Sequence, residues 1–457
     1  MMKRNRFAAL AVMTSVVFGS AASAETLSAA LTAAYNNSGL LEQNRALLRA
    51  ADEDVAQSVA ATLPVIAWSL SASSTASGSL TGSDRIITNS GLAAISGSLT
   101  LYDGGLNRLS IDAQKELVLS TRQTLRGIEQ DVLLRAVQAY MDVRRNQEFV
   151  QLRESNVRVI TQEYRAAQDR FDVGEVTRTD VASAEARLAA ARSLLAAAQG
   201  ALVQSMEEYN AAIGHMPGSA PAVSPAPVSQ TVTQAKEFAV RNHPSVLEVQ
   251  HSVAAAELNI RRGEIAVVPT VELDGSIYTD EEGNDGGSIE LSIGGPIYYG
   301  GQIASVMRQL IANRDAARAG LYVTTAAVEQ QVGNSYASLQ IAQASRLSSD
   351  QQISAARVAF EGVREEATLG SRTTLEVLNA EQELLDAQAS RISSQADEVI
   401  ASYAVLAAMG LLTAEHLRLP VQQYDPTEYY NLVKDSPALL SEQGRSLDRV
   451  LRAIGEE

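Results

Sequence analysis

Two pairs of short segments alternate apolar and polar residues with a period of two, the first over about 64–101 and the second over about 269–298. In the first pair, apolar side chains on either side of Trp68 alternate with alanine and serine. A period of two with one apolar face predicts strands. Polar, turn-forming residues predict the connecting loops at Ser77–Ser90 and Asp280–Gly287, so we expect two strand hairpins.

A long helical stretch follows each strand hairpin, over 106–170 and over 303–366. Both stretches lack proline and are rich in good helix formers. At 1.5 Å per residue, such a helix is about 100 Å long. A glycine turn then leads to a return helix that repeats apolar residues every seven positions, which is typical of a coiled coil. We therefore expect helical hairpins at about 106–212 and 303–410.

The second half of the chain repeats the first at a constant offset. Tyr140 corresponds to Tyr336 and Gly174 to Gly370, and both offsets are 196 residues (336 − 140 and 370 − 174). A proline-rich connector lies between the halves. The predicted organisation is a signal peptide at 1–24, a first repeat at 25–214, a connector at 215–234, a second repeat at 235–412 and an acidic C-terminal extension at 413–457.

The first 24 residues have the layout of a secretory signal peptide. A basic start is followed by the apolar run Phe7–Phe18 and by the small residues Ala22-Ser23-Ala24. We expect cleavage before Glu25 and export of the mature protein. No later apolar run is long enough to cross a membrane as a helix.

Composition and charge exclude several classes of function. There are 37 Lys and Arg against 53 Asp and Glu, a net charge of −16, four His and no Cys. Nucleic acid is not an expected partner, and neither a metal nor another cofactor is expected. Glu248-x-x-His251 has di-iron spacing, but its repeat partners are Gln43 and Ala46. We predict that the protein is not an enzyme.

The four strands predict an assembly of several chains. Strands of about ten residues with one apolar face suit a transmembrane barrel. Four strands cannot close a barrel, since the smallest common barrels have about eight. The alternative is a soluble periplasmic coiled-coil adaptor or scaffold, which also has a signal peptide and long helices but does not need two outward-apolar strand pairs.

The sequence resembles the outer membrane efflux family, and in particular its TolC-like branch. The resemblance rests on the order and repetition of several features: Pro64 and Pro269 at the strand starts, Tyr-x-Gly-Gly after the strands, and Phe-x-Val-Gly-x-x-x-x-x-Asp-Val from Phe171. It implies a mainly α protein with a β membrane part. Duplicated units of strand hairpin and coiled-coil helical hairpin would form a homotrimer, with a 12-stranded β-barrel continuous with a 12-helix α-barrel.

The resemblance also implies a function and partners. The protein would be a passive exit duct in the outer membrane of a Gram-negative bacterium, in contact with outer membrane lipid and reaching far into the periplasm. A periplasmic adaptor and an inner-membrane ABC or proton-driven transporter would dock on it and open its tip. Type I protein secretion and small-molecule efflux are both compatible with the sequence.

Gate residues are implied position by position. Arg372 stands where the family has a linking arginine, and Asp180 and Thr179 stand at its partners on the neighbouring hairpin. Glu376 and Asn379 fall at the constriction rings of the tunnel. A threefold ring of Glu376 would favour a bound cation or a raised pKa. Asn379 replaces an expected Asp, and Ala367 replaces a linking tyrosine, so we expect a weaker gate.

Two further groups of residues are candidates for function. The tips of the helical hairpins are implied adaptor-docking turns, and they comprise Val173, Gly174, Glu175, Leu369, Gly370 and Ser371. On the polar face of the second strand hairpin, Glu272, Asp274 and Glu290 are expected to make the barrel lumen anionic. The C-terminal extension is expected to wrap the middle of the helical barrel or to be partly disordered.

Overall fold

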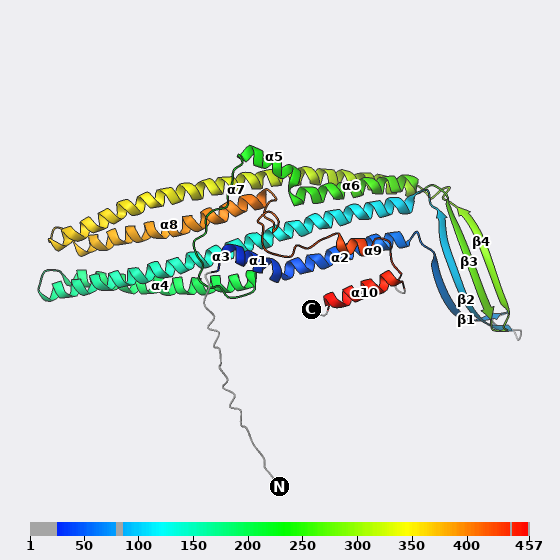
Figure 1. The fold of residues 1–457 in the computed structure, drawn as a ribbon, viewed down its shortest axis with the longest axis horizontal. Helices are drawn as coiled ribbons and strands as arrows, with labels where there is room; N and C mark the ends of the chain where they lie inside the picture. The colour runs from blue at the N-terminus through cyan, green and yellow to red at the C-terminus, as the bar shows by residue number, and fades with distance from the viewer. Residues whose placement is uncertain (1–24, 79–85, 439–440, 456–457) are drawn as a thin grey trace, which may run out of the picture.

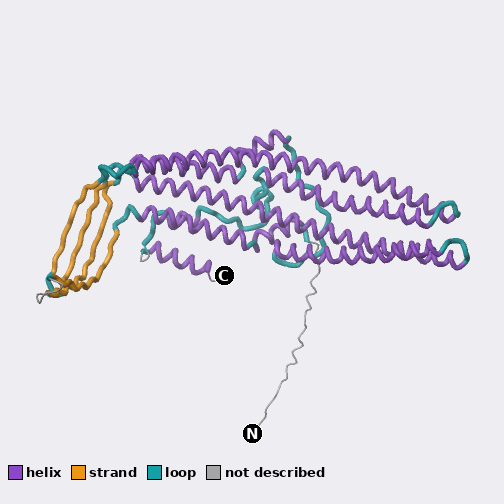
Figure 2. Tube along the Cα trace, turned by 180° about the vertical axis from the view of Figure 1, so that it is seen from behind, coloured by secondary structure: helices purple, strands orange, loops and turns teal. Residues whose placement is uncertain are grey.

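The fold is a long bundle of helices with a four-stranded sheet at one end. The computed structural model describes residues 25–78, 86–438 and 441–455. The predicted signal peptide therefore lies outside the described residues. Figure 1 shows the strands side by side at one end of the molecule and the turns of the two helical hairpins at the other. The view from behind shows the same separation of strands and helices (Figure 2).

The sheet joins the two repeats. Its strands are β1 Val65–Ser77, β2 Ile86–Tyr102, β3 Thr270–Asp280 and β4 Asp285–Gly294, antiparallel and in that order. Ile95 pairs with Trp68 on one side and with Ile277 on the other, so β2 and β3 bring the two hairpins into one sheet.

The strands extend further than the alternation predicts. The sequence pattern predicts a loop over residues 86–90, yet these residues pair with Ser73–Ser77 as part of β2. Asp285–Gly287, assigned to the second loop, begins β4. Backbone pairing across a hairpin continues as long as the register holds, even where the side chains are polar. Both predicted loops are therefore too long, because polar residues at the strand ends resemble loop residues in the sequence.

Two helices of 67 residues leave the sheet, α3 Leu106–Asp172 and α7 Gln302–Thr368. Each starts after a glycine with left-handed backbone, Gly105 and Gly301, where a residue with a Cβ would be strained. Both helices start within one residue of the predicted start and run two residues beyond the predicted end. At the helical rise, each is about 100 Å long.

The return helices are α4 Arg178–Ile213, packed on α3, and α8 Thr374–Ala408, packed on α7. The coiled-coil seam predicted for the first return helix is buried at Leu188 and Tyr209 in α4, together with the small residue Ala184. Close approach of two helices at small residues explains the alanine in this seam. Helix α8 also contacts α3, so the two helical hairpins of one chain lie against each other.

Two further helices, α2 Gly39–Ala60 and α6 Pro244–Ile265, lie alongside α3 and α7 and lead into the strands. Each is preceded by an 11-residue helix that was not predicted, α1 Leu27–Asn37 and α5 Val232–Asn242. Helix α5 begins inside the predicted connector. An 11-residue helix is marginal alone, so packing rather than propensity forms it.

The C-terminal extension packs along α2 and α3. It contains α9 Glu428–Val433, which contacts α2, and α10 Glu442–Gly455, which contacts α9. Arg45 lies between the rings of Tyr35 and Tyr424, 5.2 and 5.3 Å from their centroids. Cation–π contacts of this kind hold the extension on the helices.

The largest apolar core lies where α1, α2, α3, the end of α4 and the C-terminal extension meet. Leu31, Leu133, Tyr140, Ile213 and Leu412 are almost completely buried in it. Among the residues that the structure describes, no helix is both long and apolar enough to cross a membrane.

Candidate functional site

The turn of the first helical hairpin is fixed by local chemistry. Gly174 has a φ of 84°, and its N–H donates to the carbonyl of Phe171 at 2.9 Å. Arg170 pairs with Glu175 across the turn at 3.3 Å. Val173 and Gly174 are exposed at the end of the molecule, so this tip presents an apolar side chain and a glycine to solvent.

The turn of the second helical hairpin has the same construction. Gly370 has a φ of 78° and donates to Ala367, while Ser371 donates from its N–H and hydroxyl to the Glu366 carbonyl, at 3.0 and 2.8 Å. Leu369 is 84% exposed. The two tips thus lie at equivalent ends of the repeats, as Figure 1 shows. Their role as docking turns stays a prediction.

Each return helix starts with a reciprocal cap. Thr177 and Asp180 form a capping box at α4, and Thr373 and Glu376 form one at α8. In each box the carboxylate accepts from the threonine N–H, at 2.9 Å in the first and 2.8 Å in the second. The Thr177 hydroxyl beside Asp180 holds the pKa of that carboxyl below its usual value. These side chains therefore define where the hairpins turn back.

Arg372 holds two carboxylates together at the second tip. Its Nε donates to Glu366 at 2.8 Å and its Nη1 to Glu376 at 2.9 Å. Among the described residues, neither a hydrogen bond nor an ion pair joins Arg372 to Asp180 or Thr179 of the same chain. The Arg372 side chain is 45% exposed, and its guanidinium has five donors. A link to Asp180 and Thr179 of another copy stays a prediction.

Glu376 differs from the isolated carboxylate expected of a constriction ring. Its pKa is lowered, first by the Thr373 backbone N–H and then by Arg372. This direction is opposite to the one that repulsion within a ring would produce. Within one chain, Glu376 is thus a compensated anion.

Four polar contacts join the two helical hairpins of one chain among the described residues, and one of them is the ion pair of Arg145 on α3 with Asp397 on α8 at 3.3 Å. Asn379, the other predicted ring residue, accepts from Arg187 of α4 at 3.0 Å. Asn156 of α3 donates to Glu381 of α8 at 2.9 Å, and Arg364 of α7 lies 3.5 Å from Glu163 of α3. The sequence analysis does not select Glu381, because the positions three residues after the seven-residue repeat of α8 are polar elsewhere as well, at Gln388 and Gln395.

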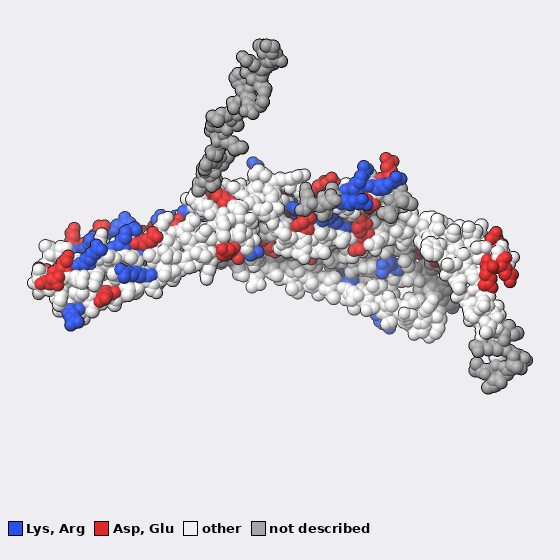
Figure 3. All heavy atoms as spheres, turned by 90° about the horizontal axis from the view of Figure 1, so that it is seen from below, with Lys and Arg blue, Asp and Glu red and all other residues white. Residues whose placement is uncertain are grey.

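The predicted lumen residues share one face of the sheet. Asp274 lies directly opposite Glu290, and Glu272 opposite Ser292. The described strand residues include no Lys or Arg, and Figure 3 shows acidic but no basic side chains on the visible part of the sheet. The opposite face is apolar, with Trp68 80% and Ile289 85% exposed in the single chain. One strongly apolar and one acidic face are what a lipid-facing and water-facing sheet requires.

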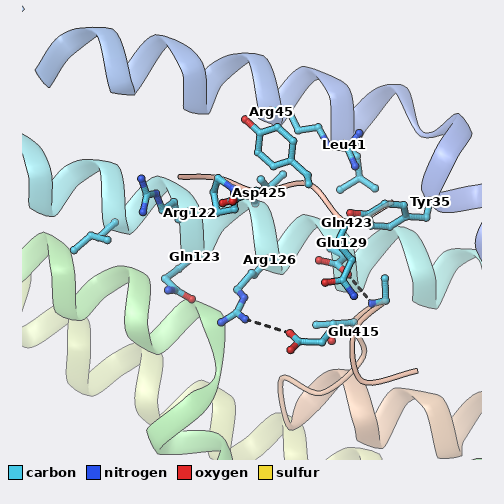
Figure 4. Close-up of a pocket in the computed structure, with 16 residues that line it drawn as sticks. Tyr35, Leu41, Arg45, Arg122, Gln123, Arg126, Glu129, Glu415, Gln423 and Asp425 are labelled. Carbon is cyan, nitrogen blue, oxygen red and sulfur yellow. Dashed lines mark hydrogen bonds and ion pairs between the residues drawn. The ribbon is translucent and has the colours of Figure 1, made fainter. Parts of the chain in front are cut away.

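A charged pocket lies between α2, α3 and the C-terminal extension, with a volume of about 540 Å³ (Figure 4). Arg126 reaches Glu415 at 3.9 Å, and Glu129 accepts from the Ala414 N–H at 2.7 Å. Burial raises the pKa of Glu129. Both contacts join the C-terminal extension to α3. We therefore interpret the charged side chains of this pocket as contacts that bind the extension to the helices. The described residues include no cluster suited to a metal ion.

Comparisons with known proteins agree with this architecture. The family model for "Outer membrane efflux protein" matches residues 30–215 and 237–411. The chain is 36% identical over 436 residues to the outer membrane efflux protein BepC of Brucella suis, covering 94% of each chain. It is 24% identical over 288 residues to the alkaline protease secretion protein AprF of Pseudomonas aeruginosa, covering 59% of each. The CmeC outer membrane channel of Campylobacter jejuni has the same fold, with a TM-score of 0.76, 14% identity and 90% of each chain covered.

Proposed function

The chain belongs to the outer membrane efflux protein family, and from this premise we propose how its repeats build an export duct. The protein is an outer membrane channel for efflux or secretion. The family is one of channels and not of enzymes. A soluble periplasmic adaptor, the alternative that the sequence left open, does not fit this membership.

In our proposal three copies close the duct. The sheet has four strands, with β1 and β4 at its free edges. Three chains would supply 3 × 4 = 12 strands and, from α3, α4, α7 and α8, 3 × 4 = 12 long helices. The apolar sheet face would contact outer membrane lipid, and edge-to-edge pairing would remove the exposed edges. The observation that carries this proposal is the single sheet with one apolar and one acidic face, joined directly to helices of about 100 Å.

The helical tips are proposed to dock the rest of the export system. The turns around Gly174 and Gly370 lie at the far end from the sheet and expose Val173 and Leu369. Apolar side chains on a rigid turn suit a protein partner. A periplasmic adaptor would bind here, and an inner-membrane ABC or proton-driven transporter would deliver the cargo. The duct itself would be passive.

The closed mouth is proposed to be held by polar links between copies. Arg372 of one chain would bridge to Asp180 and Thr179 of the next, using donors that Glu366 and Glu376 do not occupy. Glu376 and Asn379 would line the narrowest part. The position of these five residues supports the proposal. Four of them lie in the first two turns of α4 or α8, and Arg372 lies two residues before α8 begins.

The direct test is the conductance of the purified protein in a planar lipid bilayer, after native mass spectrometry has measured its mass. We expect a trimer that gives discrete, cation-selective current steps. A water-soluble species that never inserts, or a trimer without conductance, would contradict the proposed duct.

A further inference from the structure

Glu381 lies in the interface between the two helical hairpins of one chain. It is 6% exposed, and its partner Asn156 is 8% exposed. Leu378 of α8 and Ile160 of α3 are buried beside them. This carboxyl is therefore enclosed by apolar side chains from both hairpins. Its only hydrogen-bond partner among the described residues, Asn156, is 225 residues away in the sequence.

The hydrogen bonding of Glu381 is incomplete. Oε1 accepts from the Asn156 amide at 2.9 Å, whereas Oε2 is buried without a partner among the described residues. A buried carboxylate normally needs a positive charge or several donors. One amide is enough for a neutral carboxylic acid but not for an anion. The geometry thus accommodates the protonated form better.

Charged groups from three helices face this carboxyl. Glu163 on α3 repels its charge, while Arg364 on α7 and Arg187 on α4 attract it. Both arginines are engaged elsewhere, Arg364 with Glu163 and Arg187 with Asn379. Burial is the largest influence and raises the pKa of Glu381 to about 7, against the lowering effect of Asn156.

We propose that Glu381 is a proton-operated latch that holds the two helical hairpins of each chain together when it is protonated and loosens them when it ionises. The inference rests on the proposed function, because the hairpins it joins form the mouth of the duct. The other cross-hairpin contacts lie on both sides of it: Arg187 to Asn379 and Arg364 to Glu163 toward the tips, and Arg145 to Asp397 toward the sheet.

The direction with pH follows from linkage. In separated hairpins Glu381 would be hydrated and have its ordinary pKa of 4.5. The Glu381 carboxyl has the higher pKa when the hairpins are packed together. Its contribution to the stability of the packed state is therefore fully present below pH 4.5 and is lost as the pH rises through 7. None of the four histidines lies in α3, α4, α7 or α8, so imidazole titration within these helices does not contribute.

Spin-label distances between the two tips test the latch without requiring conductance. The chain has no native cysteine, so Glu175→Cys and Ser371→Cys can be labelled specifically, in trimers diluted with unlabelled chains. We expect the ratio of separated to closed tips to rise about tenfold or more from pH 5 to pH 7.5. Glu381→Gln should keep the pH 5 distribution at both pH values.

The matched control is Glu383→Gln, because Glu383 is exposed on the same helix and should leave the pH response unchanged. Distances that do not change with pH, or that change equally in Glu381→Gln, would overturn the latch whether or not the protein conducts. Loss of conductance at every pH contradicts the duct instead, so the two failures are distinguishable.

Discussion

Asp274 on β3 lies directly opposite Glu290 on β4, with Ser98 of β2 on the other side of Asp274. Two like charges facing each other across a strand pair destabilise a sheet. Their position on the acidic face is explained if that face lines a water-filled lumen, where hydration and cations screen the repulsion.

We therefore expect Asp274→Asn combined with Glu290→Gln to lower the preference of the channel for cations, with the cation-to-anion permeability ratio falling toward one. Reversal potentials in a salt gradient measure this ratio. Glu264→Gln, an exposed change on α6 below the sheet, is the control. An unchanged ratio in the double variant would place this face away from the ion path.

Arg372 and Arg170 occupy comparable tips but have different neighbours. Arg372 forms ion pairs with Glu366 and Glu376, whereas Arg170 pairs only with Glu175 among the residues that the structure describes. We expect Arg372→Ala to raise single-channel conductance, because it removes the proposed link between copies and leaves two carboxylates uncompensated. Arg170→Ala should conduct like the wild type. Equal conductance of Arg372→Ala and wild type would count against the gate.

Asp52 is completely buried on α2, and neither carboxylate oxygen has a hydrogen-bond partner among the described residues. Burial raises its pKa to about 6, although Arg122 lowers it. Because the pKa of Asp52 is raised in the folded state, the contribution of this carboxyl to the free energy of unfolding is fully present below pH about 4 and is lost as the pH rises through 6.

Asp52→Asn should thus unfold at a higher temperature than wild type at pH 8, with a gain in unfolding free energy of about 1–3 kcal/mol, and should match it closely at pH 4. Thermal melts at the two pH values measure the difference. Asp54→Asn, on the exposed side of the same helix, is expected to show no such pH dependence.

Gly214 ends α4 with a φ of 98°, and a Cβ there would lie 2.7 Å from Asn37 Nδ2 and 2.9 Å from Asn37 Cβ. Asn37 also donates to the carbonyl of Ile213 at 2.9 Å. Gly214→Ala should lower the unfolding free energy by about 2–4 kcal/mol through backbone strain and a displaced side chain.

Gly174→Ala has the same backbone strain at φ 84° but meets no atom within 4 Å, so we expect a loss of only about 1–2 kcal/mol. Chemical denaturation measures the free energy of unfolding of both variants. The difference between the two losses is the energetic cost of displacing Asn37. Equal losses would show that the strain alone accounts for the glycine.

Much of the architecture was predictable from local patterns. The seven-residue repeats and the absence of proline predicted the long helices, and period-two alternation predicted the strands. The residues of both capping boxes are also readable, although the family resemblance assigns Asp180 to the gate links and Glu376 to the constriction ring. The capping role follows from spacing, since threonine precedes an acidic residue by three positions.

Other features needed tertiary contacts. Ala30 and Ala34 of α1, like Ala235 and Ala239 of α5, are fully buried, and this packing stabilises helices too short to form alone. The pairing of β2 with β3 depends on two segments more than 160 residues apart (270 − 102 = 168).

The sequence by itself determined the order and kind of the long elements, because helix and strand periodicity is written in neighbouring residues. Only the tertiary structure decided that Asn156 meets Glu381, that Arg187 meets Asn379, and that Asp274 faces Glu290. These relationships depend on register and helix rotation, and a shift by one residue would separate each pair. Burial and charge at such meeting points set the pKa and the strength of each contact, so the chemistry of the interface between the hairpins appears only once the chain is folded.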